Sequence, residues 1–200
     1  MLAWSDCFKT DIELVDEQHQ GLFVTLNKLT DSFESGMPSE ETVMQTLQEL
    51  MDYANKHLND EEVMMQEHHL DERHVSIHKM EHCSFRYDLE HLQLHSSADE
   101  DEVQTAERIV RFITSWLVYH ILGVDMVMAA QVHAMEQGMS PEQAYETHKK
   151  IERDNATMQL ILKATLELWH TATEHCRILE EKLAALGGQS SQNSLPLAAP

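Results

Sequence analysis

The sequence predicts an all-α protein: an antiparallel four-helix bundle followed by a long C-terminal heptad helix. Six glycines and four prolines in 200 residues leave few breaks in secondary structure. The β-branched residues do not gather in the alternating runs typical of strands. Apolar residues instead recur every three or four positions, which is the helical period. A length of 200 residues fits one domain with an appendage.

The composition excludes several classes of partner. Lysine and arginine total 14 against 35 aspartates and glutamates, which gives a formal net charge of −21. Such a surface repels phosphate backbones and anionic lipid headgroups, so we expect no nucleic acid and no membrane as partners. The apolar residues are spread along the chain, and the N-terminus lacks a signal-peptide pattern. With Cys7, Cys83 and Cys176 expected as free thiols, the protein is predicted to be cytoplasmic.

The predicted bundle occupies residues 1–138. An arm, 1–11, precedes a first helix over 12–33, which ends at a Ser-Gly-Met-Pro sequence. Ser39 caps a second helix that runs to about residue 68, although Thr42 at the third position leaves the capping box incomplete. A third helix is expected over 72–95, a polar loop over 96–101, and a fourth helix over 103–137. Gly138 closes the fourth helix as a C′ residue. Short connections between helices of this length favour an antiparallel bundle.

Residues 139–187 predict a helical extension. Ser140 and Pro141 form an N-cap and first position, and the helix is expected to continue until Gly187 and Gly188 stop it. The positions of a heptad seam alternate in steps of four and three over five repeats, and all are apolar except Asn155 and Thr165: Ile151, Asn155, Met158, Leu162, Thr165, Trp169, Ala172, Cys176, Leu179, Leu183 and Leu186. This pattern is typical of a coiled-coil or dimerisation element, or of a helix packed on the bundle. The tail, 188–200, is of low complexity and is predicted to be disordered.

Fourteen histidines make metal binding the first functional question. On a helix, residues four apart share a face, so His57 and Glu61 form one ligand pair, and the third helix offers a row of three histidines at positions 74, 78 and 82. The first helix offers His19, and the fourth offers His120 with Asp125. Each of four consecutive helices thus supplies an imidazole.

A lone histidine on a half-apolar helix is more often a packing residue than a ligand. That interpretation applies to His68, His69, His91, His95, His133, His148, His170 and His175. The joint occurrence of histidines on four helices favours a metal, because the accompanying carboxylates are costly to bury unless a cation offsets them. Ligands rich in nitrogen indicate iron, zinc or copper rather than magnesium or calcium.

Over about residues 1–130 the sequence resembles the hemerythrin family in its bacterial branch. The motifs that carry the resemblance are Trp4-Ser5-Asp6 with Phe8, Val15-Asp16-Glu17-Gln18-His19, His57-Leu58-Asn59-Asp60-Glu61-Glu62 with Met65, and Trp116-Leu117-Val118-Tyr119-His120-Ile121 followed by Asp125. The resemblance implies two iron ions (Fe2+/Fe3+) inside the bundle, bridged by an oxo or hydroxo group, with dioxygen as the ligand. It further implies that one iron is held by His78, His82 and His120 and the other by His19 and His57, with Glu61 and Asp125 as bridges.

The third helix departs from the family pattern. The family's Tyr-Pro break falls here at Leu70-Asp71, and the interval from Glu61 to the third helix is altered. Choosing His74 and His78 as ligands shortens it by two residues, and choosing His78 and His82 lengthens it by two. The family's His-x-x-x-His-x-x-Phe is matched by His78, His82 and Phe85, so we expect this pair. His74 then lies outside the ligand set or at the surface. The alternative, in which His74 replaces His82 as a ligand, stays open.

The spacing of His120 and Asp125 predicts an irregular helix. Five residues place two side chains roughly 140° apart on a regular α-helix, too far to meet one metal centre. A π-bulge brings residues i and i+5 onto the same face. We therefore expect an i→i+5 backbone hydrogen bond in this segment, eased by Gly123.

The resemblance implies reversible dioxygen binding at a non-heme di-iron centre, for oxygen or redox sensing or for oxygen storage and delivery, and no enzymatic activity. The alternative is a di-iron oxidase or peroxidase that uses the same residues. The expected partners are dioxygen, a second copy of the chain bound through the C-terminal helix, and an output signalling domain.

Overall fold

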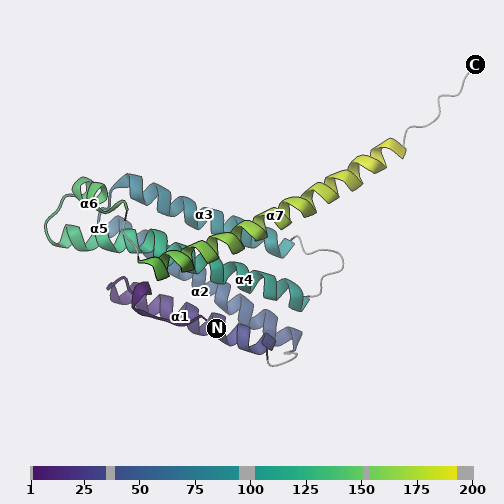
Figure 1. The fold of residues 1–200 in the computed structure, drawn as a ribbon, viewed down its shortest axis with the longest axis horizontal. Coiled ribbons are helices and arrows are strands. Elements are labelled where there is room, and N and C mark those ends of the chain that lie inside the picture. The colour runs from purple at the N-terminus through teal and green to yellow at the C-terminus, as the bar shows by residue number, and fades with distance from the viewer. Residues whose placement is uncertain (1, 35–38, 95–101, 151–153, 193–200) are drawn as a thin grey trace, which may run out of the picture.

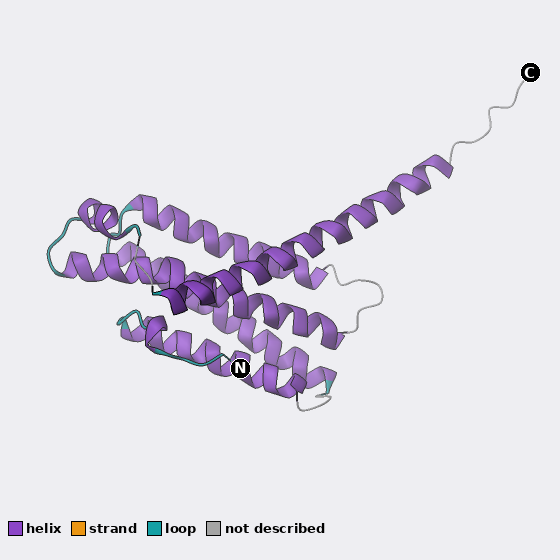
Figure 2. Cartoon of the chain, in the orientation of Figure 1, coloured by secondary structure: helices purple, strands orange, loops and turns teal. Residues whose placement is uncertain are grey.

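The computed structural model describes residues 2–34, 39–94, 102–150 and 154–192. These residues form helices joined by turns, with no strand among them (Figures 1 and 2). After a short 3-10 turn, η1 (Asp6–Phe8), the bundle consists of α1 (Glu13–Glu34), α2 (Glu40–Glu67), α3 (Glu72–Leu94) and α4 (Glu102–His120), the last continued by η2 (Ile121–Asp125) and α5 (Met126–Glu136). The predicted all-α antiparallel bundle is confirmed.

The helix ends follow the predicted capping residues. The Ser39 hydroxyl accepts a hydrogen bond from the Thr42 amide at the start of α2. At the end of α5, Gly138 has a φ of 97°, its amide donates to the Met135 carbonyl, and the next amide donates to Ala134. This pair of bonds is a Schellman motif, in which glycine adopts the left-handed conformation without steric cost. The predicted breaks at 35–38 and 96–101 lie outside the described residues.

The fourth helix of the bundle is interrupted by a π-helix. Residues Ile121–Asp125 form the π-helical segment η2, and the Met126 amide donates to the Ile121 carbonyl, an i→i+5 bond. The predicted irregularity between His120 and Asp125 is confirmed. A Cβ added at Gly123 would meet no atom within 4 Å, so the bulge does not depend on glycine for space.

One long segment, Glu102–Glu136, has the length and hydropathy of a membrane-crossing helix. Within the most apolar 18 residues of this segment, 67% is buried inside the bundle. The same segment carries His120 and Asp125, both with 0% exposure. These features are those of a core helix in a helical bundle, because neighbouring helices cover its apolar surface.

The C-terminal extension is two helices rather than one. Helix α6 (Pro141–His148) begins with a complete capping box between Ser140 and Gln143. Helix α7 (Asn155–Gln192) begins anew, with the Asp154 carboxylate accepting from the Thr157 amide at 2.7 Å. The prediction of one continuous helix from residue 141 is therefore wrong, since Asp154 starts a helix of its own. Ile151 of the predicted seam lies outside the described residues.

The predicted end of the extension is also wrong. Helix α7 continues through Gly187 and Gly188 to Gln192, into the segment expected to be disordered. A glycine weakens a helix by about 1 kcal/mol but can adopt helical dihedrals, and α7 contains no proline to end it. The rest of the predicted tail, 193–200, lies outside the described residues.

Helix α7 has two apolar faces. The docked face, formed by Ile161, Ala164 and Leu168, packs against the bundle core, mainly against α4. The exposed seam is the outward part of the predicted heptad pattern, and its members are Met158, Leu162, Trp169, Leu179 and Leu183, which are 38–68% exposed. Figure 1 shows α7 crossing α4 and extending past the end of the bundle. The helix thus packs on the bundle through a different face from the predicted seam.

Candidate metal centre

All seven predicted ligand residues meet inside the bundle. His19 comes from α1, His57 and Glu61 from α2, and His78 and His82 from α3. His120 ends α4, and Asp125 ends the π-helical segment. Each of the seven residues is no more than 1% exposed. The four helices therefore place five imidazoles and two carboxylates in one buried space.

The seven residues form two groups that share Glu61. One group is Glu61, His78, His82 and His120, and the other is His19, His57, Glu61 and Asp125. Within each group the candidate ligand atoms all lie within 4.8 Å of one another. Two adjacent groups with a common carboxylate are an arrangement that fits two metal ions.

Both carboxylates direct one oxygen to each side of the site. Asp125 Oδ1 lies 3.0 Å from His120 Nε2 and 3.3 Å from His78 Nε2, whereas Oδ2 lies 3.3 Å from His19 Nε2. Glu61 Oε2 lies 3.4 Å from His82 Nε2, and its Oε1 lies 3.7 Å from His57 Nε2. Each carboxylate can therefore bridge two ions, one oxygen to each.

Most candidate ligand atoms of the site have no hydrogen-bond partner among the described residues; the exceptions, His82 Nε2 and His120 Nε2, lie 3.2 Å apart. Both oxygens of Glu61 and of Asp125 are buried without a hydrogen-bond partner, as are His57 Nε2, His78 Nε2 and both ring nitrogens of His19. Unpaired buried carboxylates are costly, and a cation between them removes that cost. The residues present thus fit a pair of metal ions with imidazole and carboxylate ligands, a set typical of iron or zinc.

The electrostatics of the protein alone also indicate a site built for positive charge. Burial raises the pKa of Glu61 and so does the Asp125 carboxylate, but the imidazoles of His57, His78 and His82 hold it below its usual range. Burial lowers the pKa of His78, yet the adjacent carboxylates of Asp125 and Glu61 outweigh burial and raise it to about 9. Burial lowers the pKa of His120 to about 4. One proton at His78 thus offsets part of the charge of two buried carboxylates.

Two further residues orient ligand histidines, and sequence reasoning did not assign them. The Gln18 Oε1 atom lies 3.0 Å from His57 Nδ1, and its amide nitrogen donates to Asp60 at 2.6 Å. The Glu62 carboxylate lies 3.0 Å from His82 Nδ1. Partners of this kind fix the tautomer and ring orientation of a metal-binding histidine. Gln18 and Glu62 directly neighbour His19 and Glu61 in the sequence motifs, and this adjacency is the sequence feature that could have identified them.

His74 lies outside both groups of ligand atoms. Its side chain is 3% exposed, and its Nε2 lies 3.3 Å from Nδ1 of His78, on the side away from the carboxylates. Burial lowers the pKa of His74 to about 4, so the ring is neutral. The structure therefore brings His78 and His82, rather than His74, to the centre. Among the other histidines, His133 donates to the Thr10 carbonyl at 3.0 Å, which is a packing role.

Aromatic rings enclose the centre on two sides. The Trp116 ring stacks on His120, with centroids 4.2 Å apart and planes at 16°. Phe85 lies against Trp116 on the far side, at 4.2 Å. On the α1 side, the Trp4 ring is 6.4 Å from His19 and contacts Phe23 at 5.3 Å. The aromatic residues of the sequence motifs therefore pack around the ligand residues.

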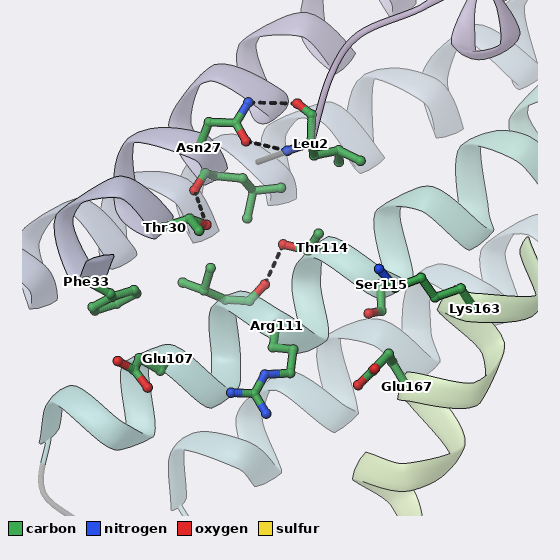
Figure 3. Close-up of a pocket in the computed structure, with 12 residues that line it drawn as sticks. Leu2, Asn27, Thr30, Phe33, Glu107, Arg111, Thr114, Ser115, Lys163 and Glu167 are labelled. Carbon is green, nitrogen blue, oxygen red and sulfur yellow. Dashed lines mark hydrogen bonds between the residues drawn. The ribbon is translucent and has the colours of Figure 1, made fainter. Parts of the chain in front are cut away.

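A separate cleft of about 500 Å³ lies between the N-terminal arm, α1, α4 and α7 (Figure 3). The Asn27 amide bonds both backbone groups of Leu2 at 2.7 Å, which fixes the arm at its edge. Arg111, Lys163 and Glu167 also line it, and none of the seven ligand residues does. The cleft is therefore not part of the candidate metal centre.

Comparison with known proteins agrees with this geometry. The Hemerythrin HHE cation binding domain matches residues 10–132. A bacteriohemerythrin of Methylococcus capsulatus is 33% identical over 126 residues, covering 62% of this chain and 92% of the relative. A bacteriohemerythrin of Clostridium acetobutylicum is 27% identical over 127 residues (62% and 96%), and a myohemerythrin of Theromyzon tessulatum is 28% identical over 122 residues (61% and 86%). No solved structure gives a significant match. With more than half of the chain matched and the ligand residues gathered in the bundle, the protein is a member of the hemerythrin family.

Proposed function

We propose that the protein binds dioxygen reversibly at a di-iron centre held by His19, His57, Glu61, His78, His82, His120 and Asp125. The observation that carries the proposal is the division of the Asp125 oxygens, Oδ1 toward His120 and His78 and Oδ2 toward His19. Together with the shared Glu61, this division supports two adjacent ions with two carboxylate bridges.

The two sides of the centre are unequal, and the inequality supports binding of an external ligand. Three imidazoles, His78, His82 and His120, serve one side, whereas His19 and His57 alone serve the other. An ion held on the second side would therefore have one protein ligand fewer and would leave room for a small molecule. When bound, the iron pair supplies the electrons that reversible dioxygen binding requires.

The chain's own residues keep the centre dry and oriented. Leu22, Phe23, Ile121 and Leu122 are 0–2% exposed in the core that contains the ligand helices. Apolar walls exclude water, which favours release of the bound molecule over its further reaction. Gln18 and Glu62 hold the rings of His57 and His82 by their outer nitrogens.

The exposed seam of α7 supports a dimer and a signalling role. Five large apolar residues of the seam face outward, which is costly for a single chain and typical of an interaction surface. Helix α7 packs on α4, the helix that ends in His120, so the extension touches the element that carries a ligand. We propose that two chains associate through the seam and that the centre serves oxygen or redox sensing, with an output domain as partner; storage is the competing role.

Anaerobic loading with iron followed by exposure to oxygen tests the proposal. We expect two irons per chain and an absorption spectrum that changes on oxygenation and returns under vacuum. Rapid stopped-flow decay of the oxygenated form, with turnover of an added reductant, would instead support the oxidase or peroxidase alternative. A chain that binds no iron would contradict both.

A further inference from the structure

The buried imidazole of His74 is not among the seven ligand residues, yet it touches one of them. It lies one turn before His78 on α3, with ring centroids 5.4 Å apart and planes at 82°. Its Nε2 is 3.3 Å from Nδ1 of His78. A buried imidazole is costly unless its polar atoms are paired, so this contact calls for a physical explanation.

The two nitrogens of His78 have different surroundings. Its Nε2 lies between the two carboxylates, 3.5 Å from Glu61 Oε2 and 3.3 Å from Asp125 Oδ1. Its Nδ1 faces His74. A histidine that binds a metal through Nε2 must carry its proton on Nδ1, and a hydrogen-bond acceptor at Nδ1 secures that tautomer. The Nε2 lone pair of His74 is in place to be this acceptor.

The fold fixes the position of His74. Its backbone amide donates to the Asp71 carbonyl at 2.9 Å in the first turn of α3. The Asp71 carboxylate is held by the Arg73 guanidinium at 2.8 Å, and Arg73 also bonds Glu146 of α6 at 2.7 Å. The neighbouring residue, Val75, packs in the apolar cluster at this end of the bundle. The backbone of His74 is therefore held by the start of α3, which Arg73 in turn connects to α6.

Two of the other ligand histidines also have a polar side chain at Nδ1. An amide oxygen (Gln18) faces Nδ1 of His57, and a carboxylate (Glu62) faces Nδ1 of His82. At His78, the group that faces Nδ1 is the imidazole of His74. We propose that His74 is a positioning residue for His78: it accepts the Nδ1 proton, fixes Nε2 as the ligand atom and holds the ring between Glu61 and Asp125. This inference rests on the proposed function, in which His78 binds a metal.

The test compares His74→Leu with His74→Gln in the full-length chain. Gln keeps an acceptor, as Gln18 does for His57, whereas Leu fills the space without one. Zn2+ binding is measured by competition with a chelator. We expect two Zn2+ per chain in every variant, with affinity lowered about 10- to 100-fold in His74→Leu and largely restored in His74→Gln. His91→Gln, on the same helix but away from the centre, is the matched control.

A second readout separates positioning from packing. In the Zn2+-loaded, 15N-labelled protein, NMR should show a slowly exchanging Nδ1 proton on His78 in the unchanged chain and in His74→Gln, but fast exchange in His74→Leu. Circular dichroism checks that each variant folds. If His74→Leu and His74→Gln had the same Zn2+ affinity and the same exchange rate of the His78 Nδ1 proton, the inference would be overturned while the metal centre would remain intact. Loss of a whole Zn2+ equivalent in both would overturn it by making His74 a ligand, and absence of Zn2+ binding in the unchanged chain would reject the proposed function itself.

Discussion

His120 Nε2 and Asp125 Oδ1 lie 3.0 Å apart although the two residues are five positions apart in the chain. The π-helical segment between them makes this possible by adding one residue to the turn. His57 and Glu61 reach the same centre from α2 at the regular spacing of four. The carboxylates of Asp125 and Glu61 thus reach the centre from two different helical geometries.

Deletion of Gly123 should be tolerated better than deletion of a residue from a regular helix. It would restore α-helical spacing and leave the aspartate four residues after His120, as Glu61 is from His57. Because aspartate is shorter than glutamate, we expect two metals per chain with affinity lowered about tenfold, or ~1.4 kcal/mol. Deletion of Thr114, which turns His120 by about 100°, should abolish binding. Equal loss in both deletions would show that the bulge itself is required.

Replacing His57 or Glu61 by alanine should remove most of the iron. Both side chains are 1% exposed, and Glu61 belongs to both ligand groups. Glu61→Ala should therefore have the larger effect, since it removes a ligand from each ion. Iron analysis of the purified proteins checks this, with Glu49→Ala on the exposed face of α2 as control. Full iron content in both variants would contradict the assignment.

The third-helix histidines should differ in their effect on the oxygenated spectrum. His82→Ala removes a ring whose Nε2 lies 3.4 Å from Glu61, so the spectrum should be lost. His74→Ala should leave the band positions nearly unchanged when iron is saturating, because His74 contacts the centre only through His78. Absorption spectra after oxygenation decide between them. The reverse pattern would place the ligands one turn earlier on α3.

The exposed seam should control the oligomeric state. Leu179→Gln combined with Leu183→Gln removes two outward apolar residues without touching the docked face, and we expect a monomer in place of a dimer. Lys182→Gln, also exposed on α7, is the control. Light scattering gives the mass. Truncation after Gly138 is a poorer test, because it also uncovers the core surface that Ala164 and its neighbours bury.

His133 should make the stability of the bundle depend on pH. Its hydrogen bond to the Thr10 carbonyl, with a further bond to Glu136, raises its pKa above the ordinary value of 6.5. A group with a raised pKa in the folded state stabilises the protein below the unfolded pKa, and this contribution is lost as the pH rises through the folded value. The difference in melting temperature between the natural chain and His133→Gln should therefore be largest below pH 6.5 and shrink as the pH rises above that value. A constant difference would contradict the linkage.

The bundle and the seven gathered residues follow from local information. Helical periodicity predicts the helices, and the spacing of five between His120 and Asp125 predicts the π-helix once both must face one centre. The orienting contact of Glu62 with His82 joins α2 to α3 across 20 residues, and no sequence periodicity reports such a contact. The break before α7 was missed because Asp154 precedes a seam position and gives no signal distinct from a polar heptad residue.

The two faces of α7 show another limit of sequence patterns. The docked face (Ile161, Ala164 and Leu168) and the exposed seam, which includes Met158, Leu162 and Leu183, both follow spacings of three and four residues. Periodicity alone therefore does not show which face meets the bundle. Packing against α4 decides it in the folded chain. The seam was identified correctly as apolar, but its contact with the bundle could not be assigned from spacing.

Helix α7 is fastened near its beginning and projects beyond the bundle at its far end (Figure 1). From Leu168, at the end of the docked face, to Gln192 the helix spans about 36 Å at 1.5 Å per residue. A rotation of about 10° at the docked face would swing its tip by roughly 6 Å on this helical geometry. In the proposed dimer, a small rearrangement beside His120 would therefore become a displacement large enough to separate or realign the helices of two chains.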